Sequence, residues 1–250
     1  VGNRQQKGRT PMYHGLKIKP PFFEIGPKAY LYGEEMLRLA KVIDRVAGKY
    51  DVQVIVTPQY TDIPLLAQNT ENILVFAQHM DPLPVGRGLG SVLPEAIKAA
   101  GAVGVMLNHA EKPISLSAIA GAIRRADEVG LATIVCADTI SEVAAIAQLA
   151  PNIIVAEPNE LIGTGKTSDN SYVTETIRIV QNINQDILVL QGAGISNGQD
   201  VYNMIMSGAQ ATGSTSGIIK APDPDAMVEE MLHALRCAWD HRHSGVNPSI

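Results

Sequence analysis

Apolar runs of four or five residues alternate with amphipathic segments along most of the chain. A run of this length that stops at glycine, proline or a polar residue predicts a buried strand, and apolar residues three or four positions apart predict a helix. The predicted strands are 22–26, 52–56, 73–77, 103–107, 132–136, 153–156, 187–190 and 210–213. The predicted helices are 34–47, 60–68, 92–100, 115–129 (capped by Ser115), 140–149, 172–183, 200–207 and 223–239.

The strict alternation of these elements predicts the fold class. A strand that follows a helix throughout requires a parallel sheet with helical crossovers. Eight such units in 250 residues favour a closed α/β barrel, a (β/α)8 barrel, over an open doubly wound sheet. We therefore predict one barrel domain over 21–250. The polar, basic and unpatterned residues 1–20 are predicted to be an arm, either disordered or lying on a neighbouring subunit.

Composition narrows the class of partner. The net charge is −5 and no block of basic residues occurs, which disfavours nucleic acid and anionic membranes as partners. We find neither an apolar run long enough to span a bilayer nor a leader pattern, so we expect no membrane partner and a cytoplasmic protein. Cys136 and Cys237 lie far apart and outside any C-x-x-C arrangement, which fits a reducing compartment.

The barrel prediction states where chemistry should lie, because active sites of this fold use the loops at the carboxyl ends of the strands. The polar residues at these positions are Lys28, Gln78, His79, Asn108, His109, Glu111 and Glu157. Gly192-Ala193-Gly194 and 214–217 follow the last two strands, where small residues let backbone N–H groups bind phosphate. Each residue alone also fits a plain structural role, such as a hydrogen-bonded histidine, a surface lysine or a glycine turn.

The stretch 153–166 is the most informative. An apolar run ends at Glu157, and Pro158 then forces the backbone out of strand geometry. The loop that follows contains Gly163 and Gly165, a composition suited to a mobile lid. Glu157 is therefore a candidate general base under a lid, and the alternative is a solvated glutamate before a flexible turn. No segment has the spacing of a metal site, so no metal is predicted.

Four strand-end segments together resemble a known family. They are AQHMDP at 77–82, LNHAE at 107–111, EPNELIGTG at 157–165 and GAGIS at 192–196. They are similar to the triosephosphate isomerase family, particularly its shorter archaeal-like form, and the similarity runs from about residue 26 to residue 221. The resemblance implies a TIM barrel and an aldose–ketose isomerase of carbohydrate metabolism, in glycolysis and gluconeogenesis. It implies a small phosphorylated sugar as substrate, no cofactor, and a homodimer or homotetramer.

The resemblance also assigns roles to residues. Glu157 becomes the base that moves a proton between adjacent carbons, and His79 the neutral group that polarises the carbonyl. Lys28 becomes the cation that neutralises substrate charge, and Glu111 its ion-pair partner. The expected substrate-binding residues are Gly163, Gly192, Gly194, Ser216 and Gly217.

Departures from the family pattern gather near the carbonyl end of the predicted site. Gly26 stands where the family usually has an asparagine that donates to the developing oxyanion, and Ala110 where it has serine. Either Tyr30 or Tyr32 enters the vacated space, or the space admits an additional hydroxymethyl group. Three alternatives to triose phosphate isomerisation therefore stay open. They are the same chemistry on a four-carbon phosphosugar such as erythrulose phosphate, a Schiff-base lyase that uses Lys28, and a non-catalytic phosphosugar-binding barrel.

Overall fold

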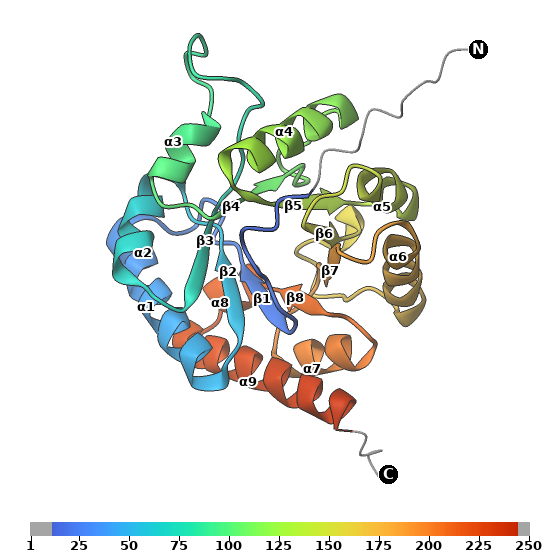
Figure 1. The fold of residues 1–250 in the computed structure, drawn as a ribbon. Coiled ribbons are helices and arrows are strands. Elements are labelled where there is room, and N and C mark those ends of the chain that lie inside the picture. Colours follow the sequence, from blue (N-terminus) through green and yellow to red (C-terminus); the bar gives the residue numbers. More distant parts are fainter. Residues whose placement is uncertain (1–11, 245–250) are drawn as a thin grey trace, which may run out of the picture.

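The computed structural model describes residues 12–244, which form a closed ring of parallel strands surrounded by helices (Figure 1). The strands are β1 (Phe22–Ile25), β2 (Gln53–Val56), β3 (Ile73–Ala77), β4 (Gly104–Leu107), β5 (Ala132–Ala137), β6 (Ile153–Ala156), β7 (Leu188–Gln191) and β8 (Ala211–Gly213). The helices are α1 (Gly33–Tyr50), α2 (Ile63–Asn69), α3 (Pro94–Ala99), α4 (Leu116–Val129), α5 (Ile140–Ala147), α6 (Asn170–Ile183), α7 (Gly198–Met206), α8 (Ser216–Ile219) and α9 (Pro224–His243), with 3-10 turns η1 (Tyr60–Asp62) and η2 (Asn159–Leu161). Because β1 pairs with both β2 and β8, the ring closes, and the predicted (β/α)8 barrel is confirmed.

The predicted elements occur in the predicted order. Strand ends agree to within one residue, because runs of β-branched residues stop at glycine, proline or polar residues. Ser115 caps α4, its side chain accepting from the Ala118 N–H at 3.2 Å. The prediction of one helix after each strand was incomplete, since α8 is an additional turn between β8 and α9. A segment of four residues is too short to show a helical period.

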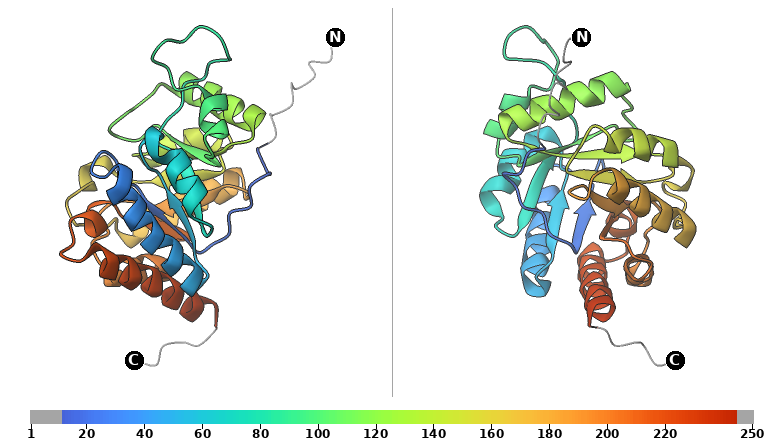
Figure 2. Two further views of the ribbon diagram at one scale, coloured as in Figure 1. Left: turned by 90° about the vertical axis from the view of Figure 1, so that its left-hand side faces the viewer. Right: turned by 45° about the vertical axis from the view of Figure 1, so that its right-hand side comes forward.

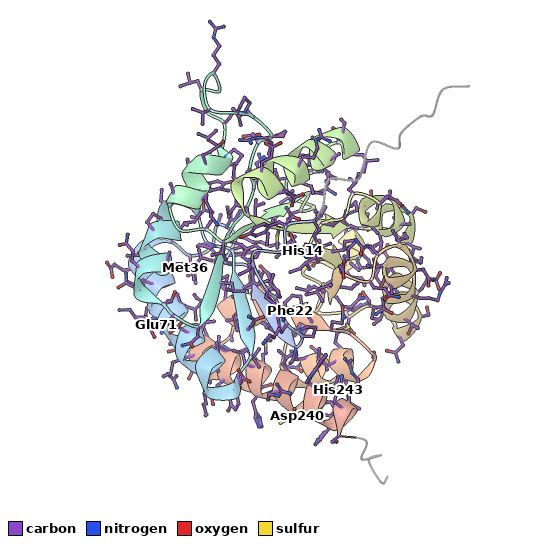
Figure 3. All side chains as sticks on the ribbon, viewed as in Figure 1. His14, Phe22, Met36, Glu71, Asp240 and His243 are labelled. Atoms are coloured by element: carbon purple, nitrogen blue, oxygen red, sulfur yellow. The ribbon has the colours of Figure 1, made fainter. Side chains whose placement is uncertain are left out.

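Each strand buries side chains on both faces. Phe22, Ile55 and Phe76 point into the barrel interior, whereas Phe23 belongs to the core between the sheet and the helices. Figure 3 shows Phe22 in the middle of the ring and Asp240 on the outer surface. Because neither face of the strands meets bulk water, a polar side chain within a strand requires a specific explanation.

The part of the predicted arm that the structure describes, residues 12–20, packs against its own barrel. Three of its side chains contact the interior cluster, namely Tyr13, Leu16 and Ile18. The Tyr13 N–H donates to Asp127 Oδ1 at 3.1 Å, and its carbonyl accepts from Asn152 Nδ2 at 2.7 Å. Figure 2 shows this segment crossing the end of the barrel where the strands begin. Residues 12–20 thus pack on the chain's own barrel, which is neither of the two predicted alternatives, disorder or contact with a neighbouring subunit. Residues 1–11 lie outside the described part.

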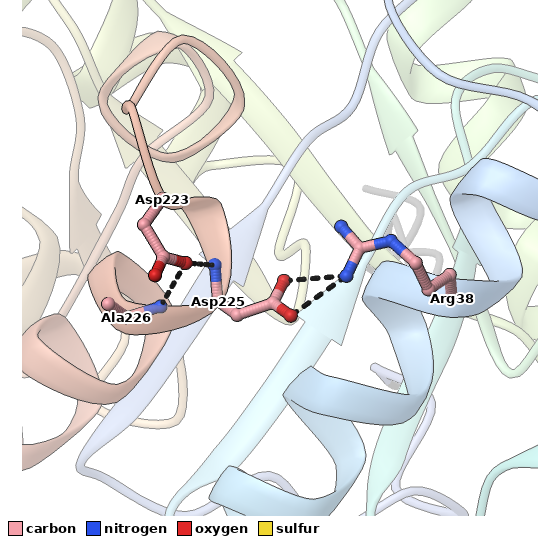
Figure 4. Close-up of polar contacts among 4 residues, drawn as sticks. All are labelled: Arg38, Asp223, Asp225 and Ala226. Carbon is pink, nitrogen blue, oxygen red and sulfur yellow. Dashed lines mark hydrogen bonds and ion pairs between the residues drawn. The ribbon is translucent and has the colours of Figure 1, made fainter.

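The first and last helices meet where the ring closes. Arg38 on α1 donates to both carboxylate oxygens of Asp225 on α9, at 2.9 and 2.8 Å (Figure 4). Asp223 caps α9 by accepting from the N–H groups of Asp225 and Ala226 at 3.1 and 3.0 Å. The cap satisfies donors that have no partner within the helix, and such caps stabilise by about 1 kcal/mol. The solvent-exposed ion pair adds about 1 kcal/mol at most.

Candidate active site

A cavity of about 350 Å³ opens at the carboxyl ends of the strands. Residues 12–20 cross the other end of the barrel, where the strands begin (Figure 2). The predicted catalytic and substrate-binding residues that line it are Lys28, His79, Glu111, Glu157, Gly163, Gly192, Gly194 and Ser216. Gly217, predicted to bind substrate, does not line it. The barrel topology thus brings residues from six loops together around one cavity.

The other polar residues expected at the strand ends divide between the cavity and the scaffold. Gln78 and His109 line the cavity. Asn108 does not line it, because its side chain is used within the protein. Its Nδ2 donates to the Cys136 carbonyl at 3.0 Å, and its Oδ1 accepts from the Ile114 N–H at 3.0 Å. Asn108 therefore holds the loop after β4 in place.

Glu157 extends β6 by one further ladder bond, its N–H donating to the Ala137 carbonyl at 2.9 Å. Its side chain lies against Gly192, where a Cβ would come within 3.0 Å of the Glu157 Cβ and Cδ. Only glycine leaves room for the carboxyl group there, so the contact with Glu157 explains Gly192. Burial raises the pKa of Glu157, while the charge of Lys28 and a hydrogen bond from the Ala193 N–H oppose that shift.

Lys28 is held in an unusual backbone conformation. Its φ of +50° is left-handed, which costs a residue other than glycine about 1–2 kcal/mol. The side-chain amides of Gln59 and Gln78 both donate to its carbonyl, at 2.7 and 2.9 Å, and so hold the strained loop. The Lys28 Nζ donates to Glu111 Oε1 at 2.7 Å, as the resemblance implies, and this contact lowers the pKa of Glu111. Gln59 was missed by the sequence analysis, and no local pattern distinguishes it.

His79 is 4% exposed and lies at the end of β3. Burial lowers its pKa, and Lys112 lowers it further, while Asp81 opposes the shift. The ring is therefore neutral at pH 7. Nε2 lies 3.3 Å from Asp81 Oδ1, and Nδ1 is buried with no hydrogen-bond partner among residues 12–244.

Residues 158–167, called the lid here, follow Glu157 and begin with η2. Gly163 lines the cavity at φ +74°, and a Cβ added there would have no atom within 4 Å, so backbone conformation and not space requires glycine. Gly194 is required for both reasons: its φ is +75°, and a Cβ there would lie 2.0 Å from the Lys166 carbonyl oxygen. The end of the lid thus packs directly on the loop after β7.

The loop after β8 supplies small polar residues to the cavity. Ser216, the first residue of α8, lines it together with Thr215. A Cβ on Gly217 would lie 2.6 Å from both the Ile195 carbonyl oxygen and Ser214 Oγ. Gly217 therefore lets α8 pack against the loop after β7 and supports the site from behind. Loops after the seventh and eighth strands together with a short additional helix form the usual phosphate site of this barrel fold.

Glu24 is a site residue that the sequence analysis missed. It lines the cavity from inside β1, where Thr57 Oγ1 donates to its Oε1 at 3.0 Å. Burial is the main cause that raises its pKa to about 7. A signal was present: in a parallel barrel both strand faces are covered, so a carboxylate within the apolar run 22–26 implies a buried acid.

Glu24 also fills the space beside Gly26 that the sequence left open. A Cβ on Gly26 would lie 2.9 Å from Glu24 Oε1 and 3.2 Å from Thr57 Oγ1. Tyr32 is 72% exposed and does not line the cavity, while Tyr30 lines it but stays 51% exposed. Neither tyrosine nor vacant space therefore accounts for Gly26. We call the group formed by Glu24, Gly26 and Thr57 the cavity floor.

The described residues limit other chemistry. Cys136 lines the cavity, but burial raises the pKa of its thiol well above the usual value, so it stays neutral and is a poor nucleophile. Within residues 12–244 no group of three or more histidine, cysteine, aspartate or glutamate side chains is placed to hold a metal ion. No helix in that part of the chain has the length and apolar character needed to cross a bilayer.

Comparisons with known proteins agree with this geometry. The family model described as triosephosphate isomerase matches residues 27–231. The chain is 42% identical over 217 residues to a triosephosphate isomerase of Methanobacterium bryantii, covering 85% of this chain and 96% of the relative. It is 40% identical over 219 residues to one of Sulfurisphaera tokodaii, covering 86% and 95%. A solved triosephosphate isomerase of Bartonella henselae superposes with a TM-score of 0.72 at 14% identity, covering 89% of this chain and 99% of that one.

Proposed function

The chain belongs to the triosephosphate isomerase family, and from that premise we propose that it interconverts glyceraldehyde 3-phosphate and dihydroxyacetone phosphate. The observation that carries the proposal is the convergence of Glu157, His79 and Lys28 on one cavity bordered by a glycine-containing lid. A carboxylate, a neutral imidazole and a cation are the groups that a proton transfer through an enediolate requires.

Glu157 is the proposed base. It removes a proton from the carbon next to the carbonyl and returns it to the adjacent carbon, while a second proton moves from the neighbouring hydroxyl oxygen to the former carbonyl oxygen. The aldehyde thus becomes a ketone without a net change in redox state and without a cofactor. Burial raises the pKa of Glu157, and a carboxylate whose conjugate acid has a higher pKa is a stronger base than an exposed glutamate. The charge of Lys28 and the hydrogen bond from the Ala193 N–H both favour the ionised form and so oppose the upward shift of its pKa.

His79 and Lys28 act on the oxygens and the charge of the substrate. A neutral imidazole beside the carbonyl is a role for which this family is itself the standard example. The ring nitrogen that donates to the substrate oxygen must carry the proton in the productive tautomer. Lys28 places a positive charge at the rim, and Glu111 holds its Nζ in position.

The lid and the loops after β7 and β8 are proposed to bind phosphate. Gly163, Gly194 and Ser216 line the cavity, and their backbone N–H groups are the proposed phosphate donors, while Gly192 and Gly217 make room for Glu157 and α8. A lid closed over the site excludes water from the enediolate, which would otherwise be lost to side reactions.

Two alternatives lose support from specific contacts. Glu24 and Thr57 occupy the immediate surroundings of Gly26, where the additional hydroxymethyl group of a four-carbon substrate was expected to fit. A Schiff-base lyase needs a neutral lysine in a desolvated pocket or beside another cation, whereas Lys28 is paired with Glu111 at 2.7 Å. We therefore propose an isomerase of triose phosphates over a four-carbon isomerase, a lyase or a mere binding protein.

Self-association and a cytoplasmic location remain our proposals. The loop between β3 and α3 projects from the barrel in Figures 1 and 2 and carries exposed apolar side chains, Val85 at 70% and Leu89 at 107%. Such a projection is suited to contact a second copy, in a homodimer or homotetramer. Sedimentation of the full chain beside a Leu89→Asp variant tests this: a smaller species for the variant is expected, and equal sizes would refute a role of this loop.

The function is tested by steady-state kinetics on purified protein. We expect efficient isomerisation of glyceraldehyde 3-phosphate, with little turnover of erythrulose phosphates. Glu157→Gln should lower kcat by about 10³-fold or more, because a general base contributes about 10²–10⁴-fold. Glu160→Gln is the matched control, since Glu160 is exposed in the lid and does not line the cavity. Wild-type protein inactive on triose phosphate, or an active Glu157→Gln variant, would refute the proposal.

A further inference from the structure

One carboxyl group in the cavity takes no part in the proposed proton transfer between carbons. Glu24 Oε1 accepts a hydrogen bond from Thr57 Oγ1 at 3.0 Å. Oε2 lies 3.2 Å from the place of a Cβ on Gly213, and within residues 12–244 it has no hydrogen-bond partner. The side chain is only half-buried because this carboxyl group borders the cavity. One oxygen of Glu24 is thus positioned by the protein, and the other is available to a ligand.

The surroundings of Glu24 determine which carboxyl group of the cavity keeps a proton. Its neighbours with a titratable group are Lys28, Cys136 and Glu157. Burial and the charge of Glu157 raise the pKa of Glu24 to about 7, against the hydrogen bond from Thr57 and a weak attraction to Lys28. For Glu157, by contrast, Lys28 is the strongest opposing influence. Two nearby carboxyl groups avoid being ionised together, so the raised pKa of Glu24 favours the state in which Glu24 keeps its proton while Glu157 is ionised.

We propose that Glu24, as a neutral carboxylic acid, is a further catalytic residue that donates a hydrogen bond from the cavity floor to the enediolate oxygen of the substrate. The inference rests on the proposed function, because only a reaction that develops negative charge on oxygen gains from such a donor. The proton stays on Glu24 throughout, and Glu157 alone exchanges a proton with carbon. Buried acids kept neutral at pH 7 act as oxyanion donors in other enzymes.

A purely structural role explains the residue poorly. Inward positions deeper in the barrel are apolar, as at Phe22, Ile55 and Phe76. An apolar side chain at residue 24 would continue that apolar lining, so packing alone does not require a carboxyl group at the edge of the cavity. Gly26 leaves the room that the Glu24 carboxyl occupies. A substrate oxygen in the cavity would supply the missing partner of Oε2.

The test compares Glu24→Gln with Glu24→Leu in the full chain, using glyceraldehyde 3-phosphate over a range of pH. Glutamine has the same shape, can accept from Thr57 and donates at every pH, so we expect kcat within about tenfold of wild type. Leucine cannot donate, and kcat should fall by about 100- to 1,000-fold, the usual effect of losing one oxyanion donor. In wild type, kcat/KM should decline as pH rises through about 7, where Glu24 loses its proton. Glu24→Gln should lack that decline.

Thr133→Val is the structural control. Thr133 is fully buried in β5 and bonds Asn152 at the other end of the barrel, so its loss should lower stability without changing the pH profile. If Glu24→Leu fails to fold, the dependence of kcat/KM on pH in Glu24→Gln still tests the inference about Glu24. Wild-type kcat in Glu24→Leu, or an unchanged alkaline decline in Glu24→Gln, would overturn the inference about Glu24. An inactive wild type would instead refute the proposed function, so the two failures are distinguishable.

Discussion

The lid side of the cavity and its floor each contain one glutamate, and the two regions treat it differently. Glu157 lies beside a cation and accepts from a backbone N–H, which favours the carboxylate despite burial. Glu24 accepts only from a hydroxyl, and the charge of Glu157 adds to the effect of burial. One protein can therefore use a single residue type as a base and as a neutral donor, because the neighbours and not the side chain set the charge.

The largest effect should follow a change on the lid side. Glu157→Asp withdraws the carboxylate by about one carbon–carbon bond, and misplacement of a reacting group by about 1 Å can cost 10²-fold in rate. We expect kcat to fall by about 10²- to 10³-fold, measured with saturating triose phosphate. The corresponding floor variant, Glu24→Asp, keeps an acid proton and should lose less. Equal losses in the two variants would contradict the separate roles.

The next prediction compares the kinetic effect of removing the Lys28 charge with the effect of removing the charge of its ion-pair partner, Glu111. Lys28→Met removes the cation and should lower kcat/KM by about 10²-fold, since a positive charge aimed at an anionic substrate in a confined site is worth several kcal/mol. Glu111→Gln should lower it less than tenfold, because Glu111 is 61% exposed and surface pairs contribute about 0–1 kcal/mol. A larger loss for Glu111→Gln than for Lys28→Met would show that the ion pair matters more than the cation itself.

The charge of Glu24 should also appear in the stability of the free protein. Its pKa rises from 4.5 to about 7 on folding, so the folded protein binds more protons than the unfolded chain between these values. The stabilisation is present below pH 4.5 and is lost as pH rises through about 7. The loss is about 3 kcal/mol at most, and less where cavity water solvates the carboxylate. Urea denaturation from pH 5 to 8 should show a smaller decline in Glu24→Gln.

That comparison needs Glu24→Gln because other groups act in the same direction. Asp127, which binds the Tyr13 N–H, has its pKa raised to about 6 by burial, and burial raises the pKa of Glu157 too. An identical decline in wild type and Glu24→Gln would mean that Glu24 is ionised over the whole range.

A smaller kinetic effect than that of Glu157→Asp or Lys28→Met is expected from Gly26→Ala. The added carbon would lie 2.9 Å from Glu24 Oε1, closer than real Cβ contacts, so the carboxyl group must shift. We expect kcat to fall about tenfold while KM changes little, because a displaced donor weakens transition-state binding in particular. Gly208→Ala is a comparison elsewhere: no atom lies within 4 Å, so strain at φ +108° should lower stability alone. A Gly26→Ala variant with full kcat would mean that the floor tolerates movement.

Sequence patterns predicted the lid side well and the floor poorly, for a physical reason. Glu157 follows an apolar run and precedes Pro158, so a local pattern places it at a strand end. Glu24 lies inside a short apolar run, and only closure of the barrel buries both faces of the strand that contains it. The contacts from Gln59 and Thr57 to residues on the first loop and strand connect positions about 30 residues apart along the chain, a distance over which local periodicity carries no information.

The most direct test follows the charge of each carboxyl group separately. Glutamate labelled with ¹³C at the δ-carbon, assigned with Glu24→Gln and Glu157→Gln, would be titrated by NMR in the unliganded protein. We predict that Glu24 loses its proton near pH 7 and, because Glu157 is assigned as the base, that Glu157 is ionised before Glu24 as pH rises. A Glu24 that is ionised at pH 6 while Glu157 carries the proton would contradict the assignment of base and donor.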